Sequence, residues 1–195
     1  MFLETICIDQ GKVRNPAGHI FRMQHTAAHF HFKAPTLPDL SSLLPTALLD
    51  AKVKCRILYR ETLLEISFEK YQPKWVQSLQ LVEASPDYSF KYADRKEMSR
   101  LLELKGEADE ILITRDGLIT DTTFSNVAFR QGDQLFTPDS YLLNGTKRQQ
   151  LLREGIITER KITSETLHKY ESVCLINAML DVGDTIPVPI SSVIP

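Results

Sequence analysis

The chain has 195 residues, of which 43% are hydrophobic and 25% are charged, and its formal net charge is −2. A chain of this length can bury a substantial core in one domain or in two small ones. The small negative charge gives no electrostatic support for binding nucleic acid or an anionic membrane surface. No stretch resembles a signal peptide or a membrane span. The composition is that of an ordinary globular protein.

The three cysteines, Cys7, Cys55 and Cys174, each lie in an apolar segment and show no C-x-x-C spacing. Isolated cysteines of this kind predict buried free thiols in a reducing compartment. We therefore expect a cytoplasmic protein.

The first half of the chain predicts alternating strands and helices. In order, we expect a strand at 2–8 that returns at 13–14, helices at 19–30 and 40–50, two strands within 52–71, a strand at 79–83 and a helix at 94–104. The first helix carries Ile20, Met23, Ala27 and Phe30 at the spacing of one apolar face.

Two hairpins and a glycine-led helix dominate the second half. Asp116-Gly117 separates two β-prone runs, and Gln131-Gly132-Asp133 separates the next two. Beyond the helix that opens at Gly145, we expect a strand at 156–162, a short helix at 164–170 and a strand at 173–177. The fold class predicted from these elements is α+β.

The segment at 84–87 contains proline and polar residues and is the best candidate for a connection between domains. We expect a small N-terminal α+β domain at 1–84, a linker at 85–89, and a larger C-terminal domain with antiparallel hairpins at 90–195.

Three histidines, His25, His29 and His31, invite a metal-binding interpretation because the first two lie one helical turn apart. No acidic or cysteine partner lies near them, and His31 falls off that helix face. We expect a surface or helix-end cluster and no metal site.

A polar run, Thr120–Asn126 (TDTTFSN), follows directly on a strand and is interrupted only by Phe124. It could form an ordinary turn or the hydrogen-bonding wall of a pocket. Further on, Gly145 stands at a helix start, where free backbone N–H groups favour an anion.

Five short motifs appear in a fixed order along the chain: HIFR at 19–22, FKYADR at 90–95, TDTTFSN at 120–126, LNGTKR at 143–148 and LINAM at 175–179. In order and spacing they resemble the class IV (fold type IV) pyridoxal-phosphate enzymes. That family includes branched-chain and D-amino-acid aminotransferases and aminodeoxychorismate lyase. The resemblance implies a two-domain fold, pyridoxal 5′-phosphate as cofactor and a small amino-acid or keto-acid substrate. The family's site lies near a subunit boundary, so a homodimer is expected.

The resemblance assigns the central catalytic role to Lys91, whose amine would hold the cofactor as a Schiff base and move the substrate's α-proton. Asp121 and Asn126 match the family's T-E-x-x-x-x-N pattern, with aspartate in place of glutamate. The carboxylate in that pattern keeps the pyridine nitrogen protonated. Aspartate preserves the charge but is one methylene shorter.

The phosphate requires cations and backbone donors. By resemblance these come from Arg22, Gly145, Thr146, Lys147, Asn177 and Ala178. The pocket would also be lined by Tyr92, Ser125 and Asn126.

The start of the chain departs from the family pattern. It opens at Phe2-Leu3-Glu4-Thr5, which aligns with the residues that follow the family's GDG run, so we expect a shortened N-terminus. The family tyrosine that often faces substrate falls near Phe2 or Leu3, which have no hydroxyl. Arg56 and Arg60 are therefore the candidates for binding the substrate carboxylate, and a regular strand would place both on one face.

Three functions stay open at this point. The leading interpretation is an aminotransferase acting on a small amino acid. The Asn177-Ala178 turn slightly favours aminodeoxychorismate lyase, which eliminates pyruvate and yields p-aminobenzoate. The shortened N-terminus and the aspartate at position 121 leave room for a non-catalytic relative.

Overall fold

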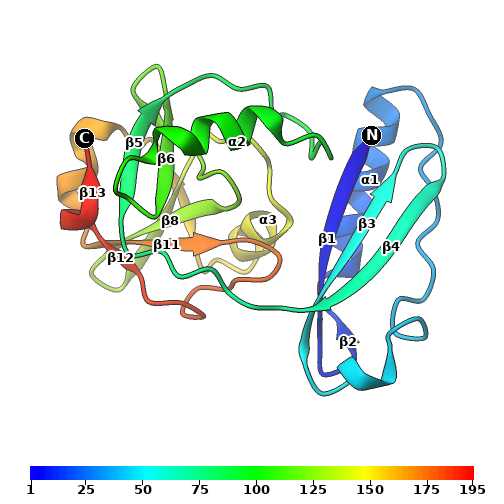
Figure 1. The fold of residues 1–195 in the computed structure, drawn as a ribbon. Coiled ribbons are helices and arrows are strands. Elements are labelled where there is room, and N and C mark those ends of the chain that lie inside the picture. Colours follow the sequence, from blue (N-terminus) through cyan, green and yellow to red (C-terminus); the bar gives the residue numbers. More distant parts are fainter. The chain divides into compact units, whose positions relative to one another are not determined.

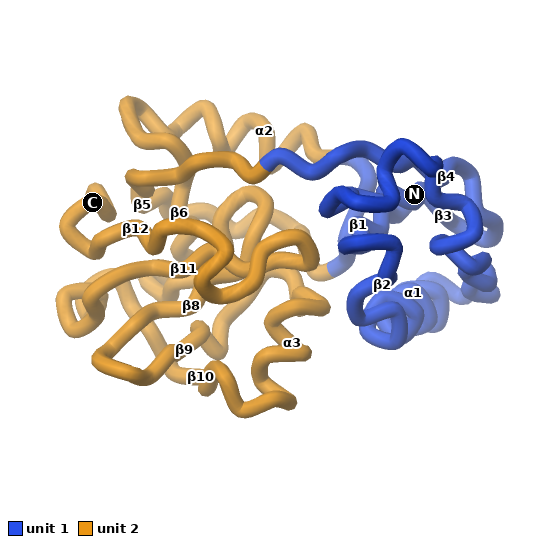
Figure 2. Tube along the Cα trace, turned by 90° about the horizontal axis from the view of Figure 1, so that it is seen from below, with its two compact units in different colours: residues 1–72, 90–94 blue, residues 73–89, 95–195 orange.

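A computed structural model describes residues 1–195 and divides into two compact units (Figure 2). Unit 1 comprises residues 1–72 and 90–94, and unit 2 comprises residues 73–89 and 95–195. Both units contain β-sheet, and helices occur in both, so the predicted α+β class is confirmed (Figure 1).

Unit 1 is an antiparallel sheet of four strands in the order β2-β1-β3-β4, with one long helix against it (Figure 1). Its elements are β1 (Phe2–Asp9), β2 (Lys12–Val13), α1 (Pro16–His29), β3 (Lys52–Tyr59) and β4 (Leu63–Lys70). Alternate residues of β1 and β3, among them Ile6, Ile8, Val53 and Ile57, form a fully buried core on one face of the sheet.

The helix predicted at 40–50 is wrong. That segment consists of turns and a single 3-10 turn, Thr46–Leu48. The Asp39 carboxylate accepts the backbone N–H of Ser41 at 3.0 Å, and Pro45 cannot donate an N–H to a helix. Leu40 and Leu44 still pack into the core of unit 1. Their apolar pattern therefore reflects burial, not helical periodicity.

Unit 2 contains two sheets, with strand orders β10-β9-β8-β11-β12 and β13-β5-β6-β7. The first is formed by β8 (Asn126–Gln131), β9 (Gln134–Pro138), β10 (Thr158–Arg160), β11 (Ser172–Ile176) and β12 (Val188–Pro189). The second is formed by β5 (Leu79–Glu83), β6 (Glu110–Arg115), β7 (Leu118–Ile119) and β13 (Val193–Ile194). The helices are α2 (Lys96–Leu102) and α3 (Thr146–Arg153), with 3-10 turns at Glu103–Lys105, Ser164–Lys169 and Ile190–Ser192.

Both predicted hairpins are confirmed. At the first, Asp116 and Gly117 have φ of 54° and 73°, the left-handed pair that a two-residue hairpin turn requires. The second joins β8 to β9 in antiparallel register. The sequence did not predict that β5 pairs parallel with β6, which requires the long crossover that contains α2.

The chain crosses between the units three times. β5 belongs to unit 2 because it pairs with β6 along its whole length. Residues 90–94 belong to unit 1 because the backbone N–H of Leu3 donates to the Lys91 carbonyl at 2.9 Å and Phe2 bridges to Tyr92. This division differs from the expected boundaries at 84 and 90, which assumed a single crossing.

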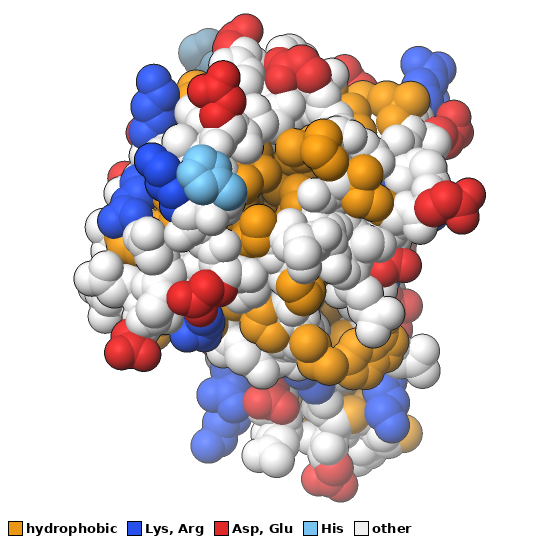
Figure 3. Space-filling model, turned by 90° about the vertical axis from the view of Figure 1, so that its left-hand side faces the viewer, with side chains coloured by type: hydrophobic (Ala, Val, Ile, Leu, Met, Phe, Trp, Pro, Cys, Tyr) orange, Lys and Arg blue, Asp and Glu red, His pale blue; other side chains and the backbone are white.

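The surface carries charges of both signs. On the face shown in Figure 3, acidic and basic side chains are interspersed and apolar side chains lie between them. No helix of the structure combines the length and apolarity that a membrane crossing requires.

Candidate active site

Asp121 is the central residue of the loop at 120–126 in unit 2. Its carboxylate is 5% exposed and is held on both oxygens. Oδ2 accepts the backbone N–H of Leu143 at 2.9 Å, and Oδ1 accepts the side-chain amide of Asn126 at 2.9 Å. Asn126 also donates to the Leu143 carbonyl at 2.8 Å. The 120–126 loop is thereby joined to the segment that leads into α3.

The side chains at positions 122 and 125 shape this loop from within. The Thr122 hydroxyl lies 2.8 Å from the Ser125 hydroxyl and accepts the Ser125 backbone N–H at 3.0 Å. Ser125, expected to line the pocket, is 6% exposed and closes this turn.

Burial raises the pKa of Asp121 to about 6, even though the N–H of Leu143, the Asn126 amide and the charge of Arg148 act in the opposite direction. Asp121 therefore gains its proton in a pH range where a free aspartate is still ionised. A protonated ring nitrogen beside Asp121 would stabilise the ionised form of its carboxyl group.

Gly145, the N-cap of α3, approaches Asn126 closely. A Cβ at position 145 would lie 2.0 Å from Asn126 Oδ1, while the backbone φ of −67° is ordinary for any residue. The neighbouring Asn126 amide therefore excludes a side chain at position 145, whereas the backbone conformation alone would accept one.

We expect Gly145→Ala to lower the free energy of unfolding by about 1–3 kcal/mol, because the new methyl overpacks a buried amide. Denaturant unfolding measures this loss. In an Asn126→Ala background the same change should cost much less, since the clashing amide is gone. An equal loss of unfolding free energy in both backgrounds would contradict a close contact between position 145 and the Asn126 amide.

α3 begins where the sequence predicted a helix, with Gly145 as its N-cap and no side chain capping it. That its first turn binds an anion stays a prediction. The side chain of Lys147 does not add a free charge there, because its ammonium binds Asp181 at 2.6 Å. Thr146 is 7% exposed and begins the helix. Any contribution of Lys147 to phosphate binding would therefore come mainly from its backbone.

The Asn177-Ala178 turn ends β11 and contacts the 120–126 loop. Asn177 Oδ1 accepts the N–H groups of Met179 at 2.8 Å and Leu180 at 3.1 Å, and its Nδ2 donates to the Phe124 carbonyl at 3.4 Å. The side chain of Asn177 therefore shapes the turn, in which Ala178 is half-buried.

Arg148, which follows Lys147 in α3, is a buried cation. It is 1% exposed, stacks 4.5 Å from the Tyr141 ring centroid, and donates from Nη2 to the Pro138 carbonyl and to Glu159. Its Nε and Nη1 have no hydrogen-bond partner. The charge of Arg148 acts on Asp121 and favours its ionised form.

In unit 1, Lys91 is half-buried and its backbone is bonded to β1 through Leu3. The residues on either side are held by aromatic contacts. Phe90 lies 4.5 Å from the His29 ring and 5.8 Å from the His25 ring, and Tyr92 lies 5.8 Å from Phe2. His25 and His29 thus pack beside the lysine segment.

Arg22 lies on α1 and binds Glu4 of β1 through two parallel hydrogen bonds. Nε donates to Oε1 at 2.8 Å and Nη2 to Oε2 at 2.5 Å. His19 Nδ1 lies 2.6 Å from Glu4 Oε2, within hydrogen-bonding distance, and burial lowers the pKa of His19. The guanidinium assigned to phosphate is therefore fixed in place by a buried carboxylate.

Glu4 is 0% exposed. Burial alone would raise its pKa, but the charge and hydrogen bonds of Arg22, with those of His19, outweigh burial and lower the pKa to about 2. Because the folded pKa is depressed, the stabilisation is fully present above about pH 4.5 and is lost as the pH falls toward 2.

We expect Glu4→Gln to destabilise the protein by about 3–5 kcal/mol at pH 7, because Arg22 is left without its counter-charge. The loss should shrink as the pH falls below 4. Glu69→Gln is the matched control, since Glu69 pairs with Lys54 at the surface and should cost under about 1 kcal/mol. Similar losses in the two variants would contradict the buried pair.

The two substrate-arginine candidates occupy different settings. Arg56 lies within β3 between Thr5 of β1 and Ser67 of β4, and it is half-buried. Arg60 lies beyond the end of β3 in an exposed turn, where its N–H donates to the Thr62 carbonyl at 3.1 Å. The expectation that both share one strand face is therefore wrong, because the strand ends at Tyr59.

The sequence motifs did not indicate that Glu4 holds Arg22 or that Leu143 binds Asp121. One signal was available: Glu4 is a charged residue at an inward position of an otherwise apolar strand, where a buried partner is expected. The roles of Arg148 and Leu143 depend on contacts between distant segments, which a motif does not reveal.

The residues fit pyridoxal phosphate on two observations. The two oxygens of an ionised carboxylate offer about four lone-pair sites, so Asp121 can accept a ring N–H beside its present donors. The start of α3 and the Asn177 turn both contact the 120–126 loop, so the helix start expected to bind phosphate and the carboxylate expected to bind the ring nitrogen belong to one cluster. When bound, the cofactor would supply the carbonyl and the electron sink.

Comparison with known proteins identifies the family. The family model described as Amino-transferase class IV matches residues 1–185. An uncharacterized protein from Haemophilus influenzae is 38% identical over 180 residues, which cover 90% of this chain and 96% of that protein.

Solved structures with a similar fold include proteins of the same family. A candidate 4-amino-4-deoxychorismate lyase from Haemophilus somnus is 38% identical, with a TM-score of 0.82 over 91% of this chain and 95% of that chain. A hypothetical aminotransferase from Mycobacterium tuberculosis in a PLP-bound form is 16% identical, with a TM-score of 0.77 over 98% of this chain and 80% of that chain, and shows the shared fold. The chain belongs to the class IV aminotransferase family of pyridoxal-phosphate enzymes.

Proposed function

We propose that this enzyme is a 4-amino-4-deoxychorismate lyase, which releases pyruvate and forms p-aminobenzoate. The observation that carries the proposal is the 38% identity, over nearly the whole of both chains, to the Haemophilus somnus protein described as a candidate 4-amino-4-deoxychorismate lyase. The Asn177-Ala178 turn, which resembles the lyase pattern, supports the same choice.

We assign a role toward the cofactor to each residue that the family resemblance picks out. Lys91 holds it covalently and afterwards acts as the base that removes the proton from the carbon bearing the substrate's amino group. Asp121 pairs with the ring nitrogen, and Asn126 orients Asp121 through the 2.9 Å hydrogen bond. The backbone of Gly145, Thr146 and Lys147 and the side chain of Arg22 bind the phosphate.

For the substrate carboxylate we favour Arg56 over Arg60. Arg56 is half-buried in a strand, where its guanidinium loses little conformational freedom on binding, whereas Arg60 is exposed in a turn. Arg56→Lys should raise KM with a smaller effect on kcat, and Arg60→Lys should change neither. Equal effects on KM would remove this distinction.

The second candidate is an aminotransferase acting on a small amino acid, which the family match supports. The two activities are separated by their products. Purified protein with pyridoxal phosphate is given 4-amino-4-deoxychorismate, and p-aminobenzoate and pyruvate are measured. In parallel it is given a panel of L- and D-amino acids with 2-oxoglutarate, and keto acids are measured. Keto acids alone would replace the lyase with the aminotransferase, and neither product would identify a non-catalytic relative.

We further propose a homodimer in the cytoplasm. The three cysteines are all unpaired and buried, which suits a reducing compartment. Sizing chromatography with light scattering tests the assembly, and a monomer at micromolar concentration would contradict it.

A further inference from the structure

A buried carboxylate outside the residues assigned above contacts the 120–126 loop. Glu110 begins β6 and is 0% exposed. Its Oε1 accepts the Thr123 hydroxyl at 2.9 Å and its own strand's Ile111 N–H at 3.0 Å. Thr123 lies two residues after Asp121, so this carboxylate holds the loop at a second point beside the Leu143 contact.

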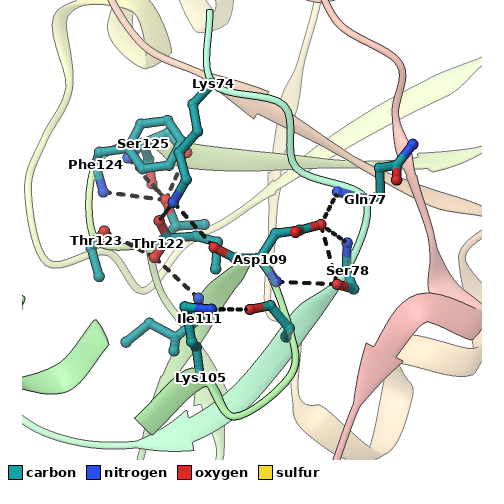
Figure 4. Close-up of polar contacts among 12 residues, drawn as sticks. Lys74, Gln77, Ser78, Lys105, Asp109, Ile111, Thr122, Thr123, Phe124 and Ser125 are labelled. Atoms are coloured by element: carbon teal, nitrogen blue, oxygen red, sulfur yellow. Dashed lines mark hydrogen bonds and ion pairs between the residues drawn. The ribbon is translucent and has the colours of Figure 1, made fainter. Parts of the chain in front are cut away.

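Lys74 completes the contact from a separate segment. Its ammonium donates to Glu110 Oε2 at 2.8 Å and to the Asp109 carbonyl at 3.1 Å, and it lies 5.4 Å from the Phe124 ring centroid. Lys74 therefore binds the loop twice, through Glu110 at Thr123 and directly at Phe124 (Figure 4).

The segment that carries Lys74 is itself fixed. Asp109 Oδ2 accepts the backbone N–H groups of Gln77 at 2.8 Å and Ser78 at 3.2 Å (Figure 4). A second cation, Arg95, donates to the Thr123 carbonyl. The backbone and the hydroxyl of Thr123 are thus each held by a charged side chain.

A fully buried carboxylate is costly unless it is paired and hydrogen-bonded. Glu110 meets that cost with donors from three segments, one of which is the loop that carries Asp121. A purely stabilising role could be met by an apolar side chain at the start of β6, without any bond to Thr123.

We propose that Glu110 and Lys74 are positioning residues for Asp121, acting through Thr123 and Phe124 on the 120–126 loop. This inference rests on the proposed role of Asp121 beside the cofactor ring. Without the Glu110–Thr123 bond the loop loses one of its attachments to β6, and the Asp121 carboxylate can shift relative to the ring nitrogen.

The test compares two threonines with the same chemistry. Thr123→Val removes the hydroxyl that binds Glu110. Thr114→Val is the matched control, because the Thr114 hydroxyl, near the other end of β6, binds Glu83 of β5 at 2.6 Å. Lys74→Met and Lys74→Arg form a second pair at a side chain that is 45% exposed, in case Thr123→Val fails to fold.

The readouts are the pyridoxal-phosphate dissociation constant, from titration of the visible band, and kcat, beside the melting temperature. We expect Thr123→Val and Lys74→Met to weaken cofactor binding and lower kcat by roughly tenfold to a hundredfold, since small misplacements of a catalytic group are costly. Thr114→Val should lower only the melting temperature, and Lys74→Arg should stay near wild type.

The inference is overturned if Thr123→Val has the same cofactor affinity and kcat as Thr114→Val. It is also overturned if Lys74→Met has the same cofactor affinity and kcat as Lys74→Arg. In either case the contact is only structural. If wild type itself shows no lysine-bound cofactor band, the proposed function fails and the positioning role fails with it.

Discussion

Lys91→Ala is expected to reduce turnover by roughly four orders of magnitude, because both the covalent hold on the cofactor and the proton transfer are lost. The visible band of lysine-bound cofactor should disappear, while the fold remains, since the contacts of this segment to β1 are made by the Lys91 backbone and by its neighbours. Absorption spectra and the product assay measure the two effects.

The control for Lys91 is Lys161→Ala, at an exposed position of unit 2. That variant should keep both the band and the activity. A Lys91→Ala protein that still shows the band would assign the covalent role to another lysine.

The second large effect is expected at Asp121. Asp121→Asn should still bind the cofactor but should lose about a hundredfold to a thousandfold in kcat, because the ring nitrogen loses its anionic partner. Asp121→Glu, which restores the residue of the family pattern, should retain much more activity. Full activity in Asp121→Asn would remove this residue from the role.

The same carboxyl predicts a pH dependence. Burial raises its pKa to about 6, so without cofactor the proton is gained as the pH falls through that value. A cationic ring beside it would lower this pKa, and activity should therefore decline as the pH falls through 6 or somewhat below. Arg148→Met should move the decline to higher pH, because the charge that favours the ionised carboxyl is removed. An unchanged pH profile in Arg148→Met would contradict this electrostatic link.

Local patterns were sufficient for much of the fold. The hairpin at Asp116-Gly117 and the helix that opens at Gly145 follow from short-range rules about turns and helix starts. The parallel pairing of β5 with β6 could not be predicted, because no local pattern records which distant strand is the partner. The false helix at 40–50 shows the converse, since buried leucines in an irregular segment imitate helical spacing.

The site was predictable as a set of residue types and not as a set of contacts. The motifs placed Asp121 and Asn126 together, and the structure shows them hydrogen-bonded. They also assigned Lys147 and Arg22 as cations for phosphate, whereas each is ion-paired with a carboxylate, Asp181 and Glu4, that the motifs do not include. Such pairs join residues far apart in the chain, so they follow from the fold and not from spacing.

The backbone bond between Leu3 and Lys91 also bears on how the protein is made. During synthesis from the N-terminus, β1 emerges early, but the segment that pairs with its first residues follows only after β5 and its flanking loops, which belong to the other unit. Contacts of such long sequence separation form late, because their loop must close first. The N-terminal strand should therefore acquire slow amide hydrogen exchange at Leu3 only in the last phase of refolding, and that phase should coincide with the appearance of cofactor binding.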